Sequence, residues 1–190
     1  MAIFKTIKMT LKLLPLHKNA EYMLECCKLI NEEWKRSETA RLRSLEGSCD
    51  KLPTCLILLE DKKVIGHVKL SVIGSIKEAC FLETVVISKD LRGKGFGSVL
   101  MKKTEEYCRE FLKLKTIFLS TKGQEGFYRK LGYSDCKPVS IYGGGTNLAE
   151  NIPNIEPSEN IILHSGPPPP PIPSHLKIMS NPKTFMKKDL

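Results

Sequence analysis

Features that would place the chain in a membrane or on a disulfide framework are missing from the sequence. No stretch approaches the run of about 18 apolar residues that a membrane-spanning helix needs. Near the N-terminus, Lys5, Lys8 and Lys12 interrupt the apolar residues, so no continuous signal-peptide core is present. The seven cysteines contain no Cys-x-x-Cys pair and no Cys/His ligand set. We therefore expect reduced thiols, no metal site and a location in the cytosol or nucleus.

Acidic residues are scarce relative to basic ones. The chain has 21 Asp and Glu against 30 Lys and Arg, which gives a net charge of +9. Such an excess suits nucleic acid, an anionic membrane surface or an acidic protein as partner. The basic residues are not interleaved with aromatic ones, and no nucleic-acid recognition motif is present. We therefore expect neither nucleic acid nor membrane as a partner.

The length of 190 residues and a hydrophobic content of 41% predict one well-buried domain that spans residues 1–190. The composition changes at Tyr142, after which glycine, asparagine and proline replace periodic sequence, and the run Pro167–Pro171 follows. We expect residues 142–175 to form a long loop insertion. Residues 176–190 are basic and are expected to form a C-terminal strand or tail.

Periodicity and turn residues predict an α/β (α+β) order of elements. The expected strands are Thr10–Leu16, Thr54–Leu59, Val64–Ser71, Cys80–Ile87, Thr116–Ser120, Tyr133–Val139 and Thr184–Met186. The expected helices are 19–34 with Asn19 as N-cap, 37–45 with Ser37 as N-cap, 97–111 and 124–131. Residues 60–63 are expected to join the second and third strands in a hairpin.

A glycine-rich loop follows the strand that ends near Ile87. It reads Arg92-Gly93-Lys94-Gly95-Phe96-Gly97 and leads into a helical pattern. Glycine lets the backbone approach a ligand closely, and free N–H groups at a helix N-terminus attract phosphate oxygens. This order of strand, loop and helix indicates a phosphate site.

A second motif lies downstream and reads Phe127-Tyr128-Arg129-Lys130-Leu131-Gly132-Tyr133. Either motif alone is a weak signal, but the two in this order and at this separation are specific. The order of elements and the two motifs resemble the GNAT acetyltransferase family over about residues 10–139. The resemblance implies a mixed, mostly antiparallel sheet of six or seven strands. It also implies helices on both faces and a V-shaped splay between the central strands.

The resemblance also implies acetyl-CoA as the co-substrate. The backbone of Val85, Val86 and Ile87 is expected to pair with the pantetheine arm as an added strand would. The expected pyrophosphate site consists of Arg92, Gly93, Lys94, Gly95, Phe96, Gly97 and Ser98. Gln124 lies where the family often has a polar cofactor contact.

Two residues match the catalytic positions that the resemblance implies. Tyr128 corresponds to the tyrosine that protonates the leaving thiolate, although the residue types alone also permit a core aromatic. Glu83 is the base candidate, acting directly or through water, because residue 81 on the same strand face is Phe. An ordinary polar strand residue remains the alternative for Glu83.

The connection between the first two helices contains Trp34, Arg36 and Arg41, and it is rich in basic residues. The two arginines suit bidentate contacts to carboxylates, and Trp34 suits the wall of a groove. The alternative is a solvated basic helix end with Trp34 in the core. The stretches EWKRS, RLRSL, ETVVI and RGKGFG, with the polyproline run, resemble the actin N-terminal acetyltransferase subfamily. That resemblance implies a cytosolic enzyme acting on the acidic N-terminus of processed actin.

The polyproline run Pro167–Pro173 is expected to form a polyproline II helix. It suits docking to profilin or another polyproline-binding partner, or serves as a stiff spacer. Two other functions remain open at this point. One is a lysine or small-amine acetyltransferase of the same fold, and the other is a proline-rich adaptor with a degenerate acyltransferase domain.

Overall fold

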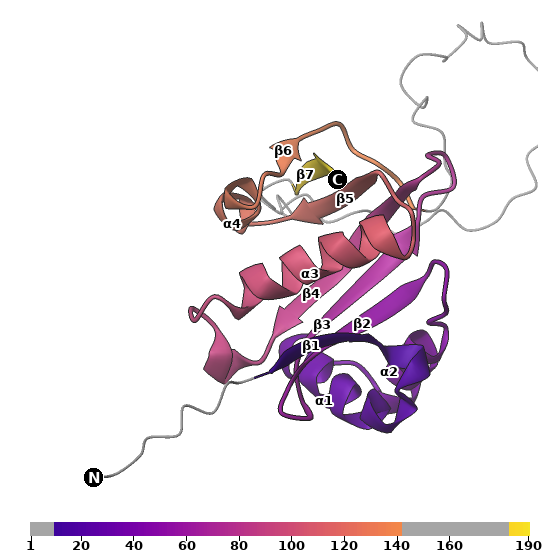
Figure 1. The fold of residues 1–190 in the computed structure, drawn as a ribbon, viewed down its shortest axis with the longest axis vertical. Coiled ribbons are helices and arrows are strands. Elements are labelled where there is room, and N and C mark those ends of the chain that lie inside the picture. Colours follow the sequence, from indigo (N-terminus) through magenta and orange to yellow (C-terminus); the bar gives the residue numbers. More distant parts are fainter. Residues whose placement is uncertain (1–9, 142–182) are drawn as a thin grey trace, which may run out of the picture. The chain divides into compact units, whose positions relative to one another are not determined.

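A computed structural model describes residues 10–141 and 183–190 of the chain (Figure 1). The strands are β1 Leu11–Pro15, β2 Thr54–Glu60, β3 Lys63–Val72, β4 Ala79–Ile87, β5 Thr116–Thr121, β6 Ser134–Asp135 and β7 Thr184–Asp189. The α-helices are α1 Met23–Glu33, α2 Glu38–Glu46, α3 Phe96–Glu110 and α4 Glu125–Lys130. Three short 3₁₀ turns, η1 Leu16–Lys18, η2 Ala20–Tyr22 and η3 Lys89–Leu91, connect them.

The seven strands form one sheet in the order β1-β2-β3-β4-β5-β7-β6. Neighbouring strands run antiparallel, except that β4 and β5 run parallel and are joined through α3. The predicted mixed, mostly antiparallel sheet is therefore confirmed. The C-terminal strand β7 pairs with both β5 and β6, and it is longer than the predicted Thr184–Met186.

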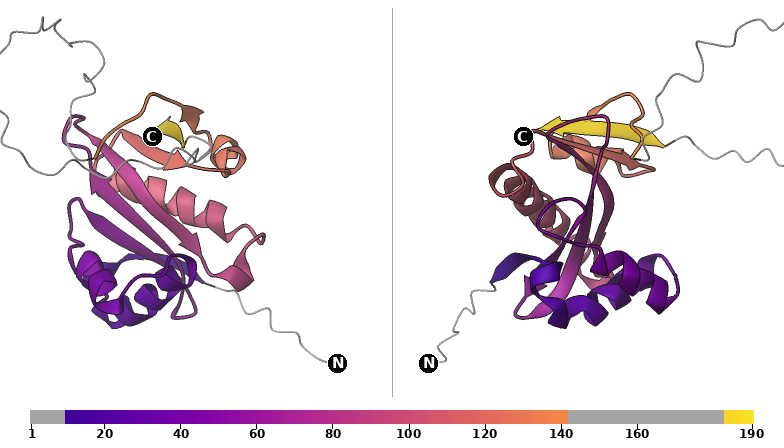
Figure 2. Two further views of the ribbon diagram at one scale, coloured as in Figure 1. Left: turned by 180° about the vertical axis from the view of Figure 1, so that it is seen from behind. Right: turned by 90° about the vertical axis from the view of Figure 1, so that its right-hand side faces the viewer.

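Helices cover both faces of the sheet, as Figure 2 shows with α1 and α2 on one side and α3 on the other. The cause is the alternation of side chains along fully buried strands. In β2, Leu56 and Leu58 pack in the cluster that contains Leu100 of α3. Their neighbour Ile57 packs in the cluster that contains Ile30 of α1.

The hairpin between β2 and β3 turns more tightly than predicted. Glu60 and Lys63 pair with each other as strand residues, so the turn consists of Asp61 and Lys62 alone. Both turn residues have positive φ, 46° and 68°, which is the conformation of a two-residue hairpin turn that matches strand twist. The predicted cap of α2 is confirmed, since the Ser37 hydroxyl accepts the Ala40 N–H at 3.3 Å.

Two local predictions were wrong. Asn19 does not cap α1, because its side-chain amide donates to the Pro15 carbonyl at 2.8 Å and the turn η2 precedes the helix. The strand predicted over Tyr133–Val139 shrinks to Ser134–Asp135. Pro138 has no N–H to donate to a ladder, which makes it a poor residue for a longer strand.

All seven cysteines lie in the described part of the chain, and all are free thiols. Five of them are buried, so they fill the core as small apolar side chains do. Within the residues that the structure describes, no helix is long and apolar enough to cross a bilayer.

Candidate active site

The central strands separate halfway along β4. Residues 79–82 of β4 pair with Thr116–Leu119 of β5, whereas residues 84–87 pair only with β3, and Glu83 is in register with neither strand. On the other arm, β5 continues to Thr121 with β7 as its neighbour. The β5-facing backbone edge of residues 83–87 therefore has no strand partner within the described ranges 10–141 and 183–190, although the Ile87 carbonyl accepts a hydrogen bond from Arg92 Nε. This is the V-shaped splay that the family resemblance implies, and Val85, Val86 and Ile87 lie on the arm of β4 beyond the point of separation.

A β-bulge marks the point where the splay begins. Lys69 pairs with Thr84 and Leu70 with Leu82, so Glu83 is an extra residue on β4. The bulge shifts the alternation of side chains, because Leu82 and Val85 both contact the cluster under α3 although they are three residues apart. The bulge thereby frees both the main chain and the side chain of Glu83 from the regular ladder.

The Glu83 carboxylate lies on the sheet face opposite α3 and has two partners from β3. Its Oε1 accepts a hydrogen bond from the Ser71 hydroxyl, and its Oε2 lies 3.0 Å from Nζ of Lys69. The Glu83 side chain is 26% exposed and that of Lys69 22% exposed. Glu83 therefore lies where the splay begins, and its two partners, Ser71 and Lys69, were not expected from the sequence.

The glycine loop leaves open space above the N-terminus of α3. Gly93 and Gly95 have φ of 75° and 87°, and a Cβ at either position would meet no atom within 4 Å. Gly95 is the N-cap of α3. Glycine is therefore required by the backbone conformation and not by crowding, and the space above the loop is available to an anion at a helix N-terminus.

Not every residue of the predicted pyrophosphate site contributes a free donor. The Ser98 N–H donates to the Gly95 carbonyl at 3.0 Å, and so it is already used in the first turn of α3. Arg92 donates through Nε to the Ile87 carbonyl at 3.1 Å and through Nη2 to Glu33 at 2.7 Å. Lys94 has an exposed side chain and Phe96 is partly buried. Lys94 is therefore the better candidate for charge toward a phosphate.

The loop and the second motif touch each other. A Cβ on Gly97 would lie 3.4 Å from Cζ of Phe127, so a larger residue at position 97 would press on α4. Gln124 is the N-cap of α4, and its carbonyl accepts the Phe127 N–H at 3.0 Å. The two motifs recognised separately in the sequence are therefore one packed unit.

Tyr128 of α4 is only 9% exposed and stacks edge-on between two aromatic rings. Its ring centroid lies 5.0 Å from that of Phe127 and 5.7 Å from that of Tyr133. Burial raises the pKa of the Tyr128 phenol to about 12, because ionisation in an apolar site is costly. The phenol therefore keeps its proton throughout the physiological pH range.

The connection between α1 and α2 presents Trp34 to solvent. Trp34 is 48% exposed, so the alternative that it is a core residue is wrong. The Arg41 guanidinium donates to the Trp34 carbonyl at 2.7 Å and to Asn31 Oδ1 at 3.0 Å. Asn31 in turn donates to the Arg36 carbonyl at 3.0 Å. Arg41 is therefore largely used to hold the connection, whereas the exposed Arg36 has no ion pair within the described residues.

Sequence reasoning missed the residues that support these side chains: Asn31, Glu33, Lys69 and Ser71. Lys69 and Ser71 alternate along β3 and so share a face, which is visible in the sequence. Their position opposite Glu83 depends on the β3–β4 register and on the bulge, and neither follows from residue types. The partners of Asn31 and Glu33 lie on other elements, so only the fold brings them together.

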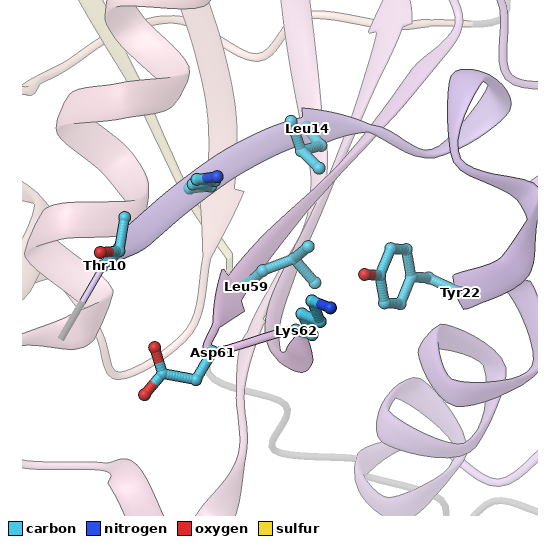
Figure 3. A pocket seen from close by; sticks show the side chains of 7 residues that line it. Thr10, Leu14, Tyr22, Leu59, Asp61 and Lys62 are labelled. Atoms are coloured by element: carbon cyan, nitrogen blue, oxygen red, sulfur yellow. The ribbon is translucent and has the colours of Figure 1, made fainter.

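The hollow drawn in Figure 3 lies away from these residues. It has a volume of about 460 Å³ and lies between β1, the β2–β3 turn and Tyr22, whose hydroxyl faces it. None of the predicted site residues lines it. No group of three or more His, Cys, Asp or Glu side chains in the described ranges is arranged to hold a metal ion. The candidate active site is therefore the splay itself, where Glu83 is exposed and Thr84 and Val85 are partly buried.

The chain belongs to the acetyltransferase (GNAT) family, whose model matches residues 19–133. Members of this family generally use acetyl-CoA. The curated protein N-alpha-acetyltransferase 80 of Mus musculus is 39% identical over 126 residues, which are 63% of this chain and 40% of that protein. The match therefore spans less than half the length of that relative.

Solved structures show the same fold at low sequence identity. Escherichia coli ElaA aligns with a TM-score of 0.57 and 14% identity over 95% of this chain and 99% of its own. The ribosomal-protein-S18-alanine N-acetyltransferase of Escherichia coli aligns with a TM-score of 0.54 and 13% identity over 67% of this chain and 80% of its own. A point mutant of the spermidine N-acetyltransferase SpeG from Vibrio cholerae aligns with a TM-score of 0.56 and 18% identity over 67% of this chain and 81% of its own.

Replacing Gly95 by Ala is expected to raise the dissociation constant of acetyl-CoA about tenfold. An alanine at positive φ costs about 1–2 kcal/mol and turns the loop amides away from the position that a pyrophosphate takes. Gly132→Ala is the matched control, since Gly132 has φ of 91° and a new Cβ there meets only Lys188. Calorimetric titration should show weaker acetyl-CoA binding for Gly95→Ala alone, while both variants lose similar thermal stability. Equal affinity in the two variants would contradict the phosphate assignment.

Proposed function

We propose that this chain is an N-terminal α-amine acetyltransferase that moves an acetyl group from acetyl-CoA to an acidic N-terminus, that of processed actin. The observation that carries the proposal is the 39% identity to N-alpha-acetyltransferase 80 over 126 residues. The exposed basic connection between α1 and α2 supports an acidic acceptor, because carboxylates pair well with guanidinium groups. The subfamily resemblance of the sequence motifs supports actin in the cytoplasm.

In the proposed reaction the acceptor nitrogen attacks the thioester carbon, and the tetrahedral intermediate collapses as the C–S bond breaks. The arm of β4 that contains Val85, Val86 and Ile87 has no strand partner on its β5 side, and it would bind the pantetheine arm by main-chain hydrogen bonds. The backbone amides of Gly93–Gly97, with Lys94, would hold the pyrophosphate, and Gln124 would add a polar contact. The donor chemistry itself is supplied by the thioester of acetyl-CoA.

Tyr128 and Glu83 lie on opposite sides of the splay, which suits the two proton transfers. Tyr128 packs in the cluster under α3, while Glu83 projects on the face that α1 and α2 cover. Tyr128 would give its proton to the departing thiolate. Glu83 would take the proton of the attacking ammonium, directly or through water, and an α-amine of pKa about 8 makes only a modest demand on that base.

We assign selection of the acceptor to Trp34, Arg36 and Arg41, each with a different role. The Trp34 ring would line the groove, and Arg41 would hold the connection in shape through its bonds to the Trp34 carbonyl and Asn31. Arg36 would then be the main contact for acceptor carboxylates. The segment that includes Pro167–Pro173 lies outside the described residues, and we propose profilin or another polyproline-binding protein as its partner.

The Arg36→Ala variant should raise KM for peptides beginning Asp-Asp-Asp about fivefold and leave kcat unchanged, since an exposed charge pair contributes up to about 1 kcal/mol. The effect should shrink at high salt, where exposed charges are screened. Lys28→Ala, which removes an equal charge from the exposed side of α1, is the control and should not change KM. If both variants behave alike, general charge and not Arg36 attracts the acceptor.

The acceptor group is tested with one acidic peptide that carries a free N-terminus and an internal lysine. Fragmentation by mass spectrometry after partial acetylation should place the acetyl group on the α-amine. Acetylation of the lysine instead would favour the hypothesis that the chain is a lysine acetyltransferase. Transfer to neither group, with acetyl-CoA bound, would favour an adaptor with a degenerate domain.

A further inference from the structure

The C-terminal turn of α1 is bonded at two points, once to η3 and once to the first residue of the glycine loop. Glu33 Oε2 accepts from Arg92 Nη2 at 2.7 Å, and the Glu32 carbonyl accepts from Lys89 Nζ at 3.0 Å. Arg92 is fixed from its other side by the bond from Nε to the Ile87 carbonyl. The guanidinium is therefore held between the end of β4 and α1.

Glu33 is the residue of α1 whose side chain bonds to Arg92, and it is followed directly by Trp34 of the proposed acceptor groove. The Glu33 side chain is 29% exposed, which is less than the 45% exposure of the Arg92 side chain. The hydrogen bond from Arg92 holds the pKa of the Glu33 carboxyl below its usual value, so the pair stays charged at neutral pH. Its neighbour in sequence, Glu32, has an exposed side chain and contributes only its main-chain carbonyl.

Trp34 follows Glu33 directly and ends α1. Its N–H donates to the Ile30 carbonyl at 2.9 Å, and its carbonyl accepts from Arg41. The backbone of Trp34 is thus held by α1 on one side and by α2 on the other, and the preceding residue is tied to the loop before α3. This set of bonds joins the proposed donor loop to the proposed acceptor groove within a few residues.

We propose that Glu33 is a positioning residue for the acceptor groove. Its bond to Arg92 keeps the turn at Trp34 at a fixed distance from the loop that holds the cofactor pyrophosphate. This inference rests on the proposed function for the identity of the two sites. Glu33 touches neither substrate. It acts through Arg92, whose side chain is an anchor for α1 more than a phosphate ligand.

The test compares Glu33→Gln with Glu32→Gln, which removes the same charge one residue earlier. Trp34 is the only tryptophan of the chain, so its fluorescence reports on the turn alone. For Glu33→Gln we expect acrylamide quenching of Trp34 to rise about twofold and KM for the preferred peptide to rise about fivefold, the size of one exposed charge pair. The value of kcat and the dissociation constant of acetyl-CoA should stay within about twofold. Glu32→Gln should match the parent protein in all four quantities.

Three results separate the possibilities. A Glu33→Gln protein with parental quenching and parental KM overturns the inference. Increased quenching with an unchanged KM also overturns it, since the pair would then be a structural tie only. The charge-swapped protein Glu33→Arg with Arg92→Glu should restore parental quenching, because the pair is rebuilt in reverse. KM is measured on whichever peptide the parent acetylates best, so failure of the acidic-acceptor proposal leaves this test intact.

Discussion

Tyr128→Phe is expected to lower kcat about 100-fold while acetyl-CoA binding is kept, because general acid catalysis typically contributes a factor of that order. Phenylalanine fills the same space between Phe127 and Tyr133, so the packing of α4 should survive. Stopped assays that follow free thiol release give kcat, and calorimetry gives the acetyl-CoA affinity. Unchanged kcat would show that the phenol is not the proton donor.

The pH profile of the parent enzyme gives a second check on Tyr128. With a pKa of about 12, less than about 1% of the phenol is ionised at pH 9.5, so the acid stays available. The value of kcat should therefore not fall between pH 8 and pH 9.5 through loss of this proton. Tyr128→Phe should reduce kcat by the same factor across that range, whereas a folding defect would appear as lost thermal stability.

Glu83→Gln is expected to lower kcat/KM between about tenfold and 100-fold at pH 7, since the amide cannot accept the ammonium proton. The α-amine of a peptide has a pKa near 8, so at pH 9.5 most acceptor molecules are already neutral. The defect should therefore shrink as the pH rises. A loss of equal size at pH 7 and pH 9.5 would assign Glu83 a structural role instead.

Ser71→Ala is the control for the Glu83 prediction. It removes the hydroxyl that donates to Oε1 but leaves the carboxylate and its ion pair with Lys69. The expected loss in kcat/KM is less than about fivefold, because one hydrogen bond to a charged group is removed and the base remains. A loss as large as that of Glu83→Gln would mean that orientation of the carboxylate matters as much as its basicity.

Elements governed by local sequence were predictable. The alternating and continuous apolar runs of β2, β3 and β4 and the helical spacing in α3 matched the structure to within a residue or two. The splay at β4 came from the family resemblance and is seen directly in the pairing of residues 79–82 alone with β5. The failures lie where a side chain has a choice of partners, as when Asn19 turns back to Pro15 instead of capping α1.

Residues that act across the fold were out of reach of the sequence. The bulge at Glu83 depends on a one-residue change of register against β3, and that change also decides which side chains face Lys69. The use of Arg92 and Arg41 as anchors depends on their contacts with α1. This helix is distant from Arg92 in sequence, and the connection to α2 separates it from Arg41. Residue type predicted their charge, and only the fold shows how that charge is used.

The acceptor claim is tested most directly by a competition in which one reaction contains equal amounts of four peptides. These begin Asp-Asp-Asp, Ser and Met, and the fourth has a blocked N-terminus and an internal lysine. Mass spectrometry of early time points gives the ratio of kcat/KM values. We predict that the acidic peptide is favoured at least about tenfold, and that this preference falls as salt rises. Equal rates, or a preference for the Ser, Met or lysine peptide, would contradict the account.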